Sequence, residues 1–166
     1  PEGPGYWCYG TGRFVLMLAA FESAFGTTFG LFETPGFAQT ADFIDAMTGP
    51  SGKFWNFSDG AAGRSECVCD GWLARKTGRR GILAFDNRAF REQYAQRTNP
   101  KFKPKAGEFL PFRMLWADFS PVSDAAAPLD YASEGGNPVV VMRSSLDENA
   151  AYMGLKGGKS CCNHGH

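Results

Sequence analysis

The order of two hydrophobic patterns along the chain constrains its fold more than any other feature. Residues 14–97 carry apolar side chains three or four positions apart, the spacing of amphipathic helices. Residues 138–156 contain two short runs that are rich in apolar and β-branched side chains, which is typical of strands. Helices that come first and strands that come second predict either an α+β fold or two different domains joined in one chain.

Four helices are expected, each ended by glycine or proline. The predicted helices cover residues 14–25, 36–48, 65–77 and 82–97. Gly26 and Gly78 are natural C-terminal glycines, while Gly49-Pro50 and Asn99-Pro100 end the other two helices. Residues 49–63 are rich in turn-forming residues and are predicted to form a loop.

The second half of the chain has a different character. The lysine- and proline-containing segment 98–108 is predicted to be a linker, and residues 109–119 a short helix or irregular structure. Residues 120–137 are expected to form a loop, followed by a hairpin of strands 138–145 and 151–156. The predicted boundary divides the chain into residues 1–108 and 109–166.

Charge and hydropathy exclude several classes of protein. The 166 residues include 17 basic and 17 acidic side chains, so the formal net charge is zero. A neutral chain is poorly suited to broad electrostatic binding of nucleic acid or of anionic membranes. No apolar run approaches the roughly 20 residues that a membrane-spanning helix requires.

The five cysteines leave two interpretations open, and their odd number leaves at least one thiol unpaired. Thiolate and imidazole are good zinc ligands, so one interpretation is a metal cluster. That cluster would contain Cys67, Cys69, Cys161, His164 and His166. The other interpretation, which we favour because the spacings do not match a zinc ribbon, is that the cysteines are small buried side chains.

Four segments carry side chains suited to chemistry. They are residues 1–10 with Glu2, Tyr6, Trp7 and Tyr9; residues 54–60 with Trp55 and Asn56; Arg143 at the end of a strand; and Asn163-His164-Gly165-His166. Aromatic rings stack on sugars, and carboxyl, phenol and imidazole groups move protons. The first three segments also have structural interpretations: aromatics packed on the core, an Asx turn at Asp59, and an ion pair of Arg143.

These segments, in this order, resemble the heparinase II/III-like polysaccharide lyase family. The similarity lies in Pro1-Glu2-Gly3-Pro4-Gly5-Tyr6-Trp7, Tyr9-Gly10-Thr11, Phe29-Gly30-Leu31, Pro35-Gly36-Phe37, Asn56-Phe57-Ser58-Asp59, Met142-Arg143-Ser144-Ser145 and Lys156-Gly157-Gly158 before Asn163-His164-Gly165-His166. The resemblance implies an α/α toroid followed by a β-sandwich domain. Residues 1–108 would be the last toroid helices and residues 109–166 the first part of the sandwich, within a larger bacterial protein that is periplasmic or secreted.

The resemblance also implies an activity, which is β-elimination on polysaccharides that contain uronic acid. The implied catalytic residues are His164, Glu2, Tyr6 and Tyr9; the implied substrate-binding residues are Trp7, Trp55, Asn56, Arg143 and Asn163; and His166 would bind a structural zinc. The other zinc ligands would come from elsewhere in the larger protein. The chain by itself is expected to be inactive and, because helix faces lack partners, to associate with itself.

One position departs from the family. The resemblance places a catalytic tyrosine in residues 56–59, where this chain has Phe57. A phenyl ring cannot move a proton, so either Tyr6 or Tyr9 substitutes, another residue serves, or catalysis is lost. The alternative to a lyase is therefore a non-catalytic relative that binds carbohydrate or has a structural role.

Overall fold

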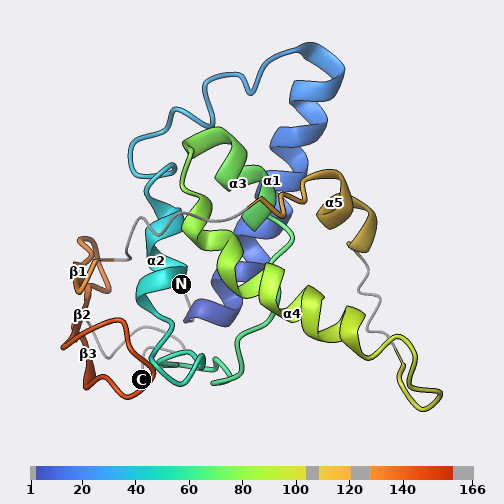
Figure 1. Ribbon diagram of the computed structural model, residues 1–166. Coiled ribbons are helices and arrows are strands. Elements are labelled where there is room, and N and C mark those ends of the chain that lie inside the picture. Colours follow the sequence, from blue (N-terminus) through green and yellow to red (C-terminus); the bar gives the residue numbers. More distant parts are fainter. Residues whose placement is uncertain (1–2, 104–108, 121–127, 159–166) are drawn as a thin grey trace.

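The computed structural model describes residues 3–103, 109–120 and 128–158 of the chain. Within these residues, helices come first and a three-stranded antiparallel sheet follows, so the predicted mixed α+β class is confirmed. Figure 1 shows the sheet on one side of the helices, next to α2. No helix in the described residues is both long and apolar enough to cross a membrane.

The helical part has five α-helices in the described residues and one short 3-10 helix. They are α1 (Pro4–Phe25), α2 (Thr40–Ala46), α3 (Asp70–Thr77), η1 (Arg80–Ile82), α4 (Leu83–Ala95) and α5 (Leu110–Leu115). Gly26 (φ 71°) and Gly78 (φ 73°) adopt left-handed conformations immediately after α1 and α3, which confirms both predicted ends.

The predicted start of the first helix was wrong, because α1 begins at Pro4 rather than near Phe14. Proline fits the first turn, where its missing N–H would have no partner within the helix. Trp7, one turn further on, is buried in the core and holds this end of the helix in place. The aromatic residues between glycines at positions 5–10 are therefore helical and not a loop.

Two other helices start later than the sequence predicts. Helix α2 begins at Thr40, after a run of turns, and α3 begins at Asp70 instead of residue 65. Cys67 lies in the extended stretch before α3 and forms a disulfide with Cys8 of α1. That bond fixes the stretch against α1 and leaves the helix to start after it.

The sheet consists of β1 (Asp130–Ala132), β2 (Val139–Arg143) and β3 (Tyr152–Lys156), with β2 in the centre. Val139 pairs with Lys156 and Arg143 with Tyr152, so the predicted hairpin is confirmed. Strand β1 lies within a segment that was predicted to be a loop. Val139 and Val141 are buried, and they form the sheet's contribution to the core.

The helices bury a compact set of apolar side chains. Leu18, Ile44, Met47, Leu73 and Ile82 are less than 2% exposed and come from α1, α2, the residue after α2, α3 and η1. Arg143 and Tyr152 then join the sheet to this core, because both side chains donate hydrogen bonds to the Ala46 carbonyl at the end of α2. Two hollows lie at this junction between the helices and the sheet.

Candidate functional site

Two hollows lie where the helices meet the sheet, one at each end of β2. The first, here called the aromatic pocket, has a volume of about 400 Å³ and is lined by the rings of Trp7, Phe43, Phe57 and Tyr131 beside Val139. The second, the arginine cleft, has a volume of about 870 Å³ and includes Arg143. Both include residues that the sequence indicated for substrate binding.

Trp7 belongs mainly to the core, although it also lines the aromatic pocket. Its ring centre lies 6.4 Å from that of Phe43, and its indole N–H donates a 2.6 Å hydrogen bond to the Thr40 hydroxyl. Only 6% of Trp7 is exposed. A ligand in the pocket could therefore touch only an edge of the indole, not stack on its face.

Trp55 and Phe57 lie together between α1 and the sheet. Their ring centres are 5.5 Å apart, and the Lys156 ammonium lies 5.8 Å from the centre of the Phe57 ring. Gly3, at the start of α1, packs so closely on the Phe57 carbonyl that a Cβ there would lie 2.7 Å from its oxygen. The structure thus gathers three segments that the resemblance named: the start of α1, the loop around Phe57, and the end of β3.

Asn56 is exposed in this loop, and its side-chain amide donates a 2.9 Å hydrogen bond to the Gly60 carbonyl. This bond closes the turn that contains Ser58, whose φ of 54° is left-handed. Asn56 therefore shapes the loop, while its position at the surface leaves it accessible to a ligand.

Tyr6 and Tyr9 are not brought together with Phe57. Both are exposed on α1, and neither lines the aromatic pocket. Tyr9 instead lies beside Arg13, whose guanidinium carbon is 5.4 Å from the ring centre. The tyrosine that does line the pocket is Tyr131 of β1, and burial, with a smaller contribution from Asp42, raises its pKa.

The arginine cleft collects three guanidinium groups from separate parts of the chain. Arg64 precedes α3, Arg88 lies on α4 and Arg143 ends β2. The cleft also includes three acidic residues, Asp45 of α2, Glu92 of α4 and Glu148 after β2, so its acidic and basic side chains are equal in number. Arg88 is exposed at the opening.

Arg64 is the most deeply buried of the three, with 4% of its side chain exposed. Its Nη1 donates a 2.8 Å hydrogen bond to the Thr48 hydroxyl and lies 3.6 Å from Asp45 Oδ1. The guanidinium also lies 4.5 Å from the centre of the Phe85 ring. Nε and Nη2 of Arg64 make no hydrogen bond within the described residues, although Nη2 is 3.9 Å from Asp70 Oδ2.

Burial is the main influence on the pKa values of the acidic groups around Arg64. It raises the pKa of Asp45 even though Arg64 opposes the shift, and it raises the pKa of the fully buried Asp70 strongly, with Asp86 adding to the effect. Asp45 and Asp70 both lie within 4 Å of the buried Arg64 guanidinium, so the exposed Arg88 is the arginine of the cleft that an anion could reach.

Arg143 holds the sheet to α2. Its Nη2 donates to the Ala46 and Asp45 carbonyls at 3.0 and 3.3 Å, and its guanidinium lies 5.5 Å from the Tyr152 ring centre. Its Nε makes no hydrogen bond in the described part of the chain. Burial raises the pKa of Tyr152 to about 12, and its hydroxyl is bonded to Ala46, so this phenol is a poor proton acceptor.

Four predicted residues lie outside the described residues: Glu2, Asn163, His164 and His166. The described residues hold no group of three or more His, Cys, Asp or Glu that could bind a metal, and they include neither histidine. Cys67 is bonded to Cys8 and Cys69 is a buried thiol, which disagrees with a zinc cluster built on Cys67. Cys161 and Cys162 also lie outside the described residues.

The sequence did not single out Arg64, Arg88 or Tyr131. Arg64 follows a glycine in a polar stretch without periodicity, Arg88 looks like an ordinary polar position of α4, and Tyr131 lies in the segment predicted to be a loop. Only the tertiary structure brings these side chains to the two hollows.

Comparison with protein-family models found no matching family, and comparison with curated proteins found no match.

Proposed function

We propose that the protein is a polysaccharide lyase-like protein that acts on a polysaccharide containing uronic acid. The observation that carries this proposal is the arginine cleft, in which Arg64, Arg88 and Arg143 surround one polar hollow of about 870 Å³. Guanidinium groups bind carboxylate and sulfate oxygens through paired hydrogen bonds. The cleft is large enough for a sugar, and the exposed Arg88 can bind its carboxylate, while Asp45, Glu92 and Glu148 balance the charge of the three arginines. The aromatic pocket offers a second contact along the same sheet.

The proposed reaction is β-elimination. A base removes the proton at C5 of the uronate, the C4–O bond breaks, and a double bond forms between C4 and C5. An acid gives a proton to the departing oxygen. The C5 proton is weakly acidic because it is next to the carboxyl group, and a cation on that carboxylate stabilises the negative charge that develops.

The residues assigned to the proton transfers come from the resemblance. His164 is the proposed catalytic imidazole, with Glu2 lining the substrate cleft. Tyr131 lines the aromatic pocket, about 13 Å from the arginine cleft along β2, so its phenol would contact a neighbouring sugar of the same chain. Burial raises the pKa of this phenol, which makes it a weaker acid than an ordinary tyrosine.

We also propose the fold of the longer protein to which the chain would belong. The helices would belong to an α/α toroid and the sheet to a β-sandwich, in a periplasmic or secreted protein. His166 would provide one ligand of a structural zinc, for which the described residues supply no further ligands. The order of helices before strands supports this arrangement.

A non-catalytic carbohydrate-binding protein is the second candidate. The observation that favours it is Phe57, together with the position of Tyr6 and Tyr9 away from the aromatic pocket. Such a protein would retain the arginine cleft and bind the same acidic chains without cleaving them.

The experiment mixes the protein with heparan, chondroitin or alginate chains and measures the ultraviolet absorbance of the new double bond. Binding of each polysaccharide is measured in parallel. Cleavage is measured with the larger protein, both as the wild type and as the His164→Ala variant. Absorbance that disappears in the variant supports the lyase. Binding without any absorbance supports the second candidate, and the absence of both overturns the proposal.

The role of the arginine cleft is tested with a matched pair of variants. Arg88→Gln removes an exposed charge at the cleft, whereas Arg91→Gln removes an exposed charge from the same helix outside it. We expect the first variant to weaken binding of the acidic chain about tenfold, as the loss of a charge-assisted hydrogen bond would, and the second to have little effect. Equal losses would show that only the overall charge matters.

A further inference from the structure

A third hollow lies among the helices, away from the sheet, and is here called the interhelical pocket. It is lined by residues of α3, α4 and α5 and has a volume of about 150 Å³. Leu83, Phe90, Met114 and Trp116 give it a mainly apolar lining. A cavity of about this size with apolar walls is large enough to bind a single benzene ring.

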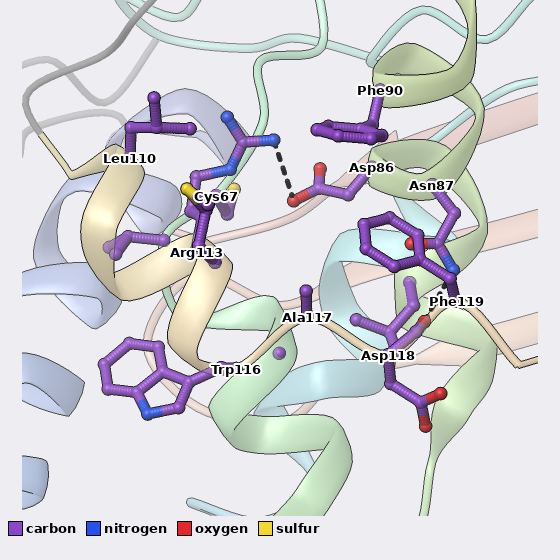
Figure 2. Close-up of a pocket in the computed structure, with 14 residues that line it drawn as sticks. Cys67, Asp86, Asn87, Phe90, Leu110, Arg113, Trp116, Ala117, Asp118 and Phe119 are labelled. Atoms are coloured by element: carbon purple, nitrogen blue, oxygen red, sulfur yellow. Dashed lines mark hydrogen bonds and ion pairs between the residues drawn. The ribbon is translucent and has the colours of Figure 1, made fainter. Parts of the chain in front are cut away.

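The pocket also contains one incompletely satisfied ion pair. Figure 2 shows Asp86 of α4 and Arg113 of α5 facing each other from opposite sides. Arg113 Nη2 lies 3.7 Å from Asp86 Oδ2, too far for a direct hydrogen bond, while Arg113 Nη1 donates to Glu66 at 2.7 Å. Asp86 Oδ1 and Arg113 Nε are both buried and make no hydrogen bond among the described residues.

Neither of these two buried atoms is accessible from the pocket, so a ligand would have to bridge Asp86 Oδ2 and Arg113 Nη2, which lie 3.7 Å apart. A buried acceptor without a partner costs free energy, and so does a buried donor. A hydroxyl group can donate to a carboxylate oxygen and accept from a guanidinium N–H. The side chains of Asn87 and Asp118, which also line the pocket, already have partners: Asn87 donates to the Asp118 carbonyl at 2.9 Å, and Asp118 Oδ2 lies 2.9 Å from Arg80 Nη2.

We propose that the interhelical pocket binds a small phenol, with the ring among the apolar side chains and the hydroxyl between Asp86 and Arg113. The aromatic lining favours a planar ring, since Phe90 and Phe119 lie with their ring centres 5.0 Å apart at this pocket. When Asp86 and Glu66 are both ionised, they carry two negative charges against the single positive charge of Arg113. An acidic ligand is therefore disfavoured. This site is independent of the polysaccharide proposal.

The test measures the binding of phenol and of toluene to the complete 166-residue chain by isothermal titration calorimetry. Both molecules present a ring, but only phenol has the hydroxyl. We expect phenol to bind about tenfold more tightly, the effect of one hydrogen bond to a charged group. In Asp86→Leu, which replaces the acceptor with an apolar side chain of similar size, the preference for phenol should disappear while toluene still binds.

A second pair of variants tests the location. Ala117 is exposed at the pocket, so Ala117→Phe should block it without disturbing the core, and Ala95→Phe at the exposed end of α4 is the matched control. Phenol should also shift the methyl resonances of Leu83 and Leu110 and leave those of Val139 and Val141 in the sheet unchanged. Absence of phenol binding, equal binding of toluene, or unchanged binding in Ala117→Phe would each overturn the proposal.

Discussion

The indole of Trp55 lies directly against Gly154 of β3. A Cβ on Gly154 would be 2.3 Å from Trp55 Cδ2 and 2.5 Å from Cε2, well inside van der Waals contact. The backbone N–H of Trp55 also donates to the Met47 carbonyl at 2.8 Å. Trp55 is therefore clamped between the residue after α2 and the sheet, and this contact sets the position of the loop that carries Phe57.

Gly154→Ala should displace Trp55 and destabilise the fold. Overpacking of this kind costs about 1–3 kcal/mol in the free energy of unfolding, which urea denaturation measures. Gly10→Ala is the control, because a Cβ at that exposed helical position meets nothing within 4 Å. It should stabilise the chain by about 0.5–1 kcal/mol. Equal stability of Gly154→Ala and the wild type would contradict the close contact.

Thr40→Val should leave the buried Trp7 N–H without its acceptor. The hydrogen bond joins the first turns of α1 and α2, and its loss should cost about 1–3 kcal/mol, because the indole donor stays buried. Thr40→Ser retains the hydroxyl and should lose clearly less. Chemical denaturation followed by tryptophan fluorescence compares the two, and a loss in Thr40→Val no larger than that in Thr40→Ser would contradict the role of the hydroxyl.

Reduction of the Cys8–Cys67 disulfide should lower stability substantially. The bond joins residues 59 positions apart, so it restricts the unfolded chain strongly, and losing such a bond typically costs 2–5 kcal/mol. Thermal denaturation with and without dithiothreitol provides the measurement. The Cys8→Ala/Cys67→Ala double variant is the control, since its melting temperature should be low already and should not respond to the reductant.

Stability should rise as the pH falls from 7 towards 4. Burial raises the pKa of Asp86 to about 6, with Arg113 opposing and Glu66 reinforcing the shift. Between the unfolded value of 3.8 and about 6, the folded chain therefore binds a proton that the unfolded chain has lost. The free energy of unfolding decreases as the pH rises through this window, by at most about 3 kcal/mol for this group.

Asp86→Asn isolates this contribution, because it removes the titrating group and nearly preserves the shape. The difference in unfolding free energy between wild type and variant should change across pH 4–7 and then stay constant above it. Urea denaturation at a series of pH values gives this difference. Parallel profiles for the two proteins would show that Asp86 has an ordinary pKa.

The helix ends and the hairpin were predictable because local chemistry determines them. Gly26 and Gly78 end α1 and α3 because glycine adopts positive φ without steric cost. The β-branched run at Val139–Val141 indicated a buried strand, and the pairing with β3 followed from the short connection. These features depend on residues that are close in sequence.

What could not be predicted depends on contacts between distant residues. Five cysteines do not reveal that Cys8 pairs with Cys67, and that bond accompanies the late start of α3. The burial of Trp7 extends α1 to Pro4, although aromatics between glycines indicated a loop. Of the arginine cleft, only Arg143 was indicated by the sequence, because Arg64 and Arg88 reach it from other elements.

The central strand β2 also determines how far apart the two hollows are. Val139 lines the aromatic pocket and Arg143 the arginine cleft, and four residue steps of about 3.3 Å separate them by about 13 Å. Strands on both sides hold β2, so this distance does not depend on flexible loops. A molecule that contacts both hollows at once must therefore be longer than a monosaccharide.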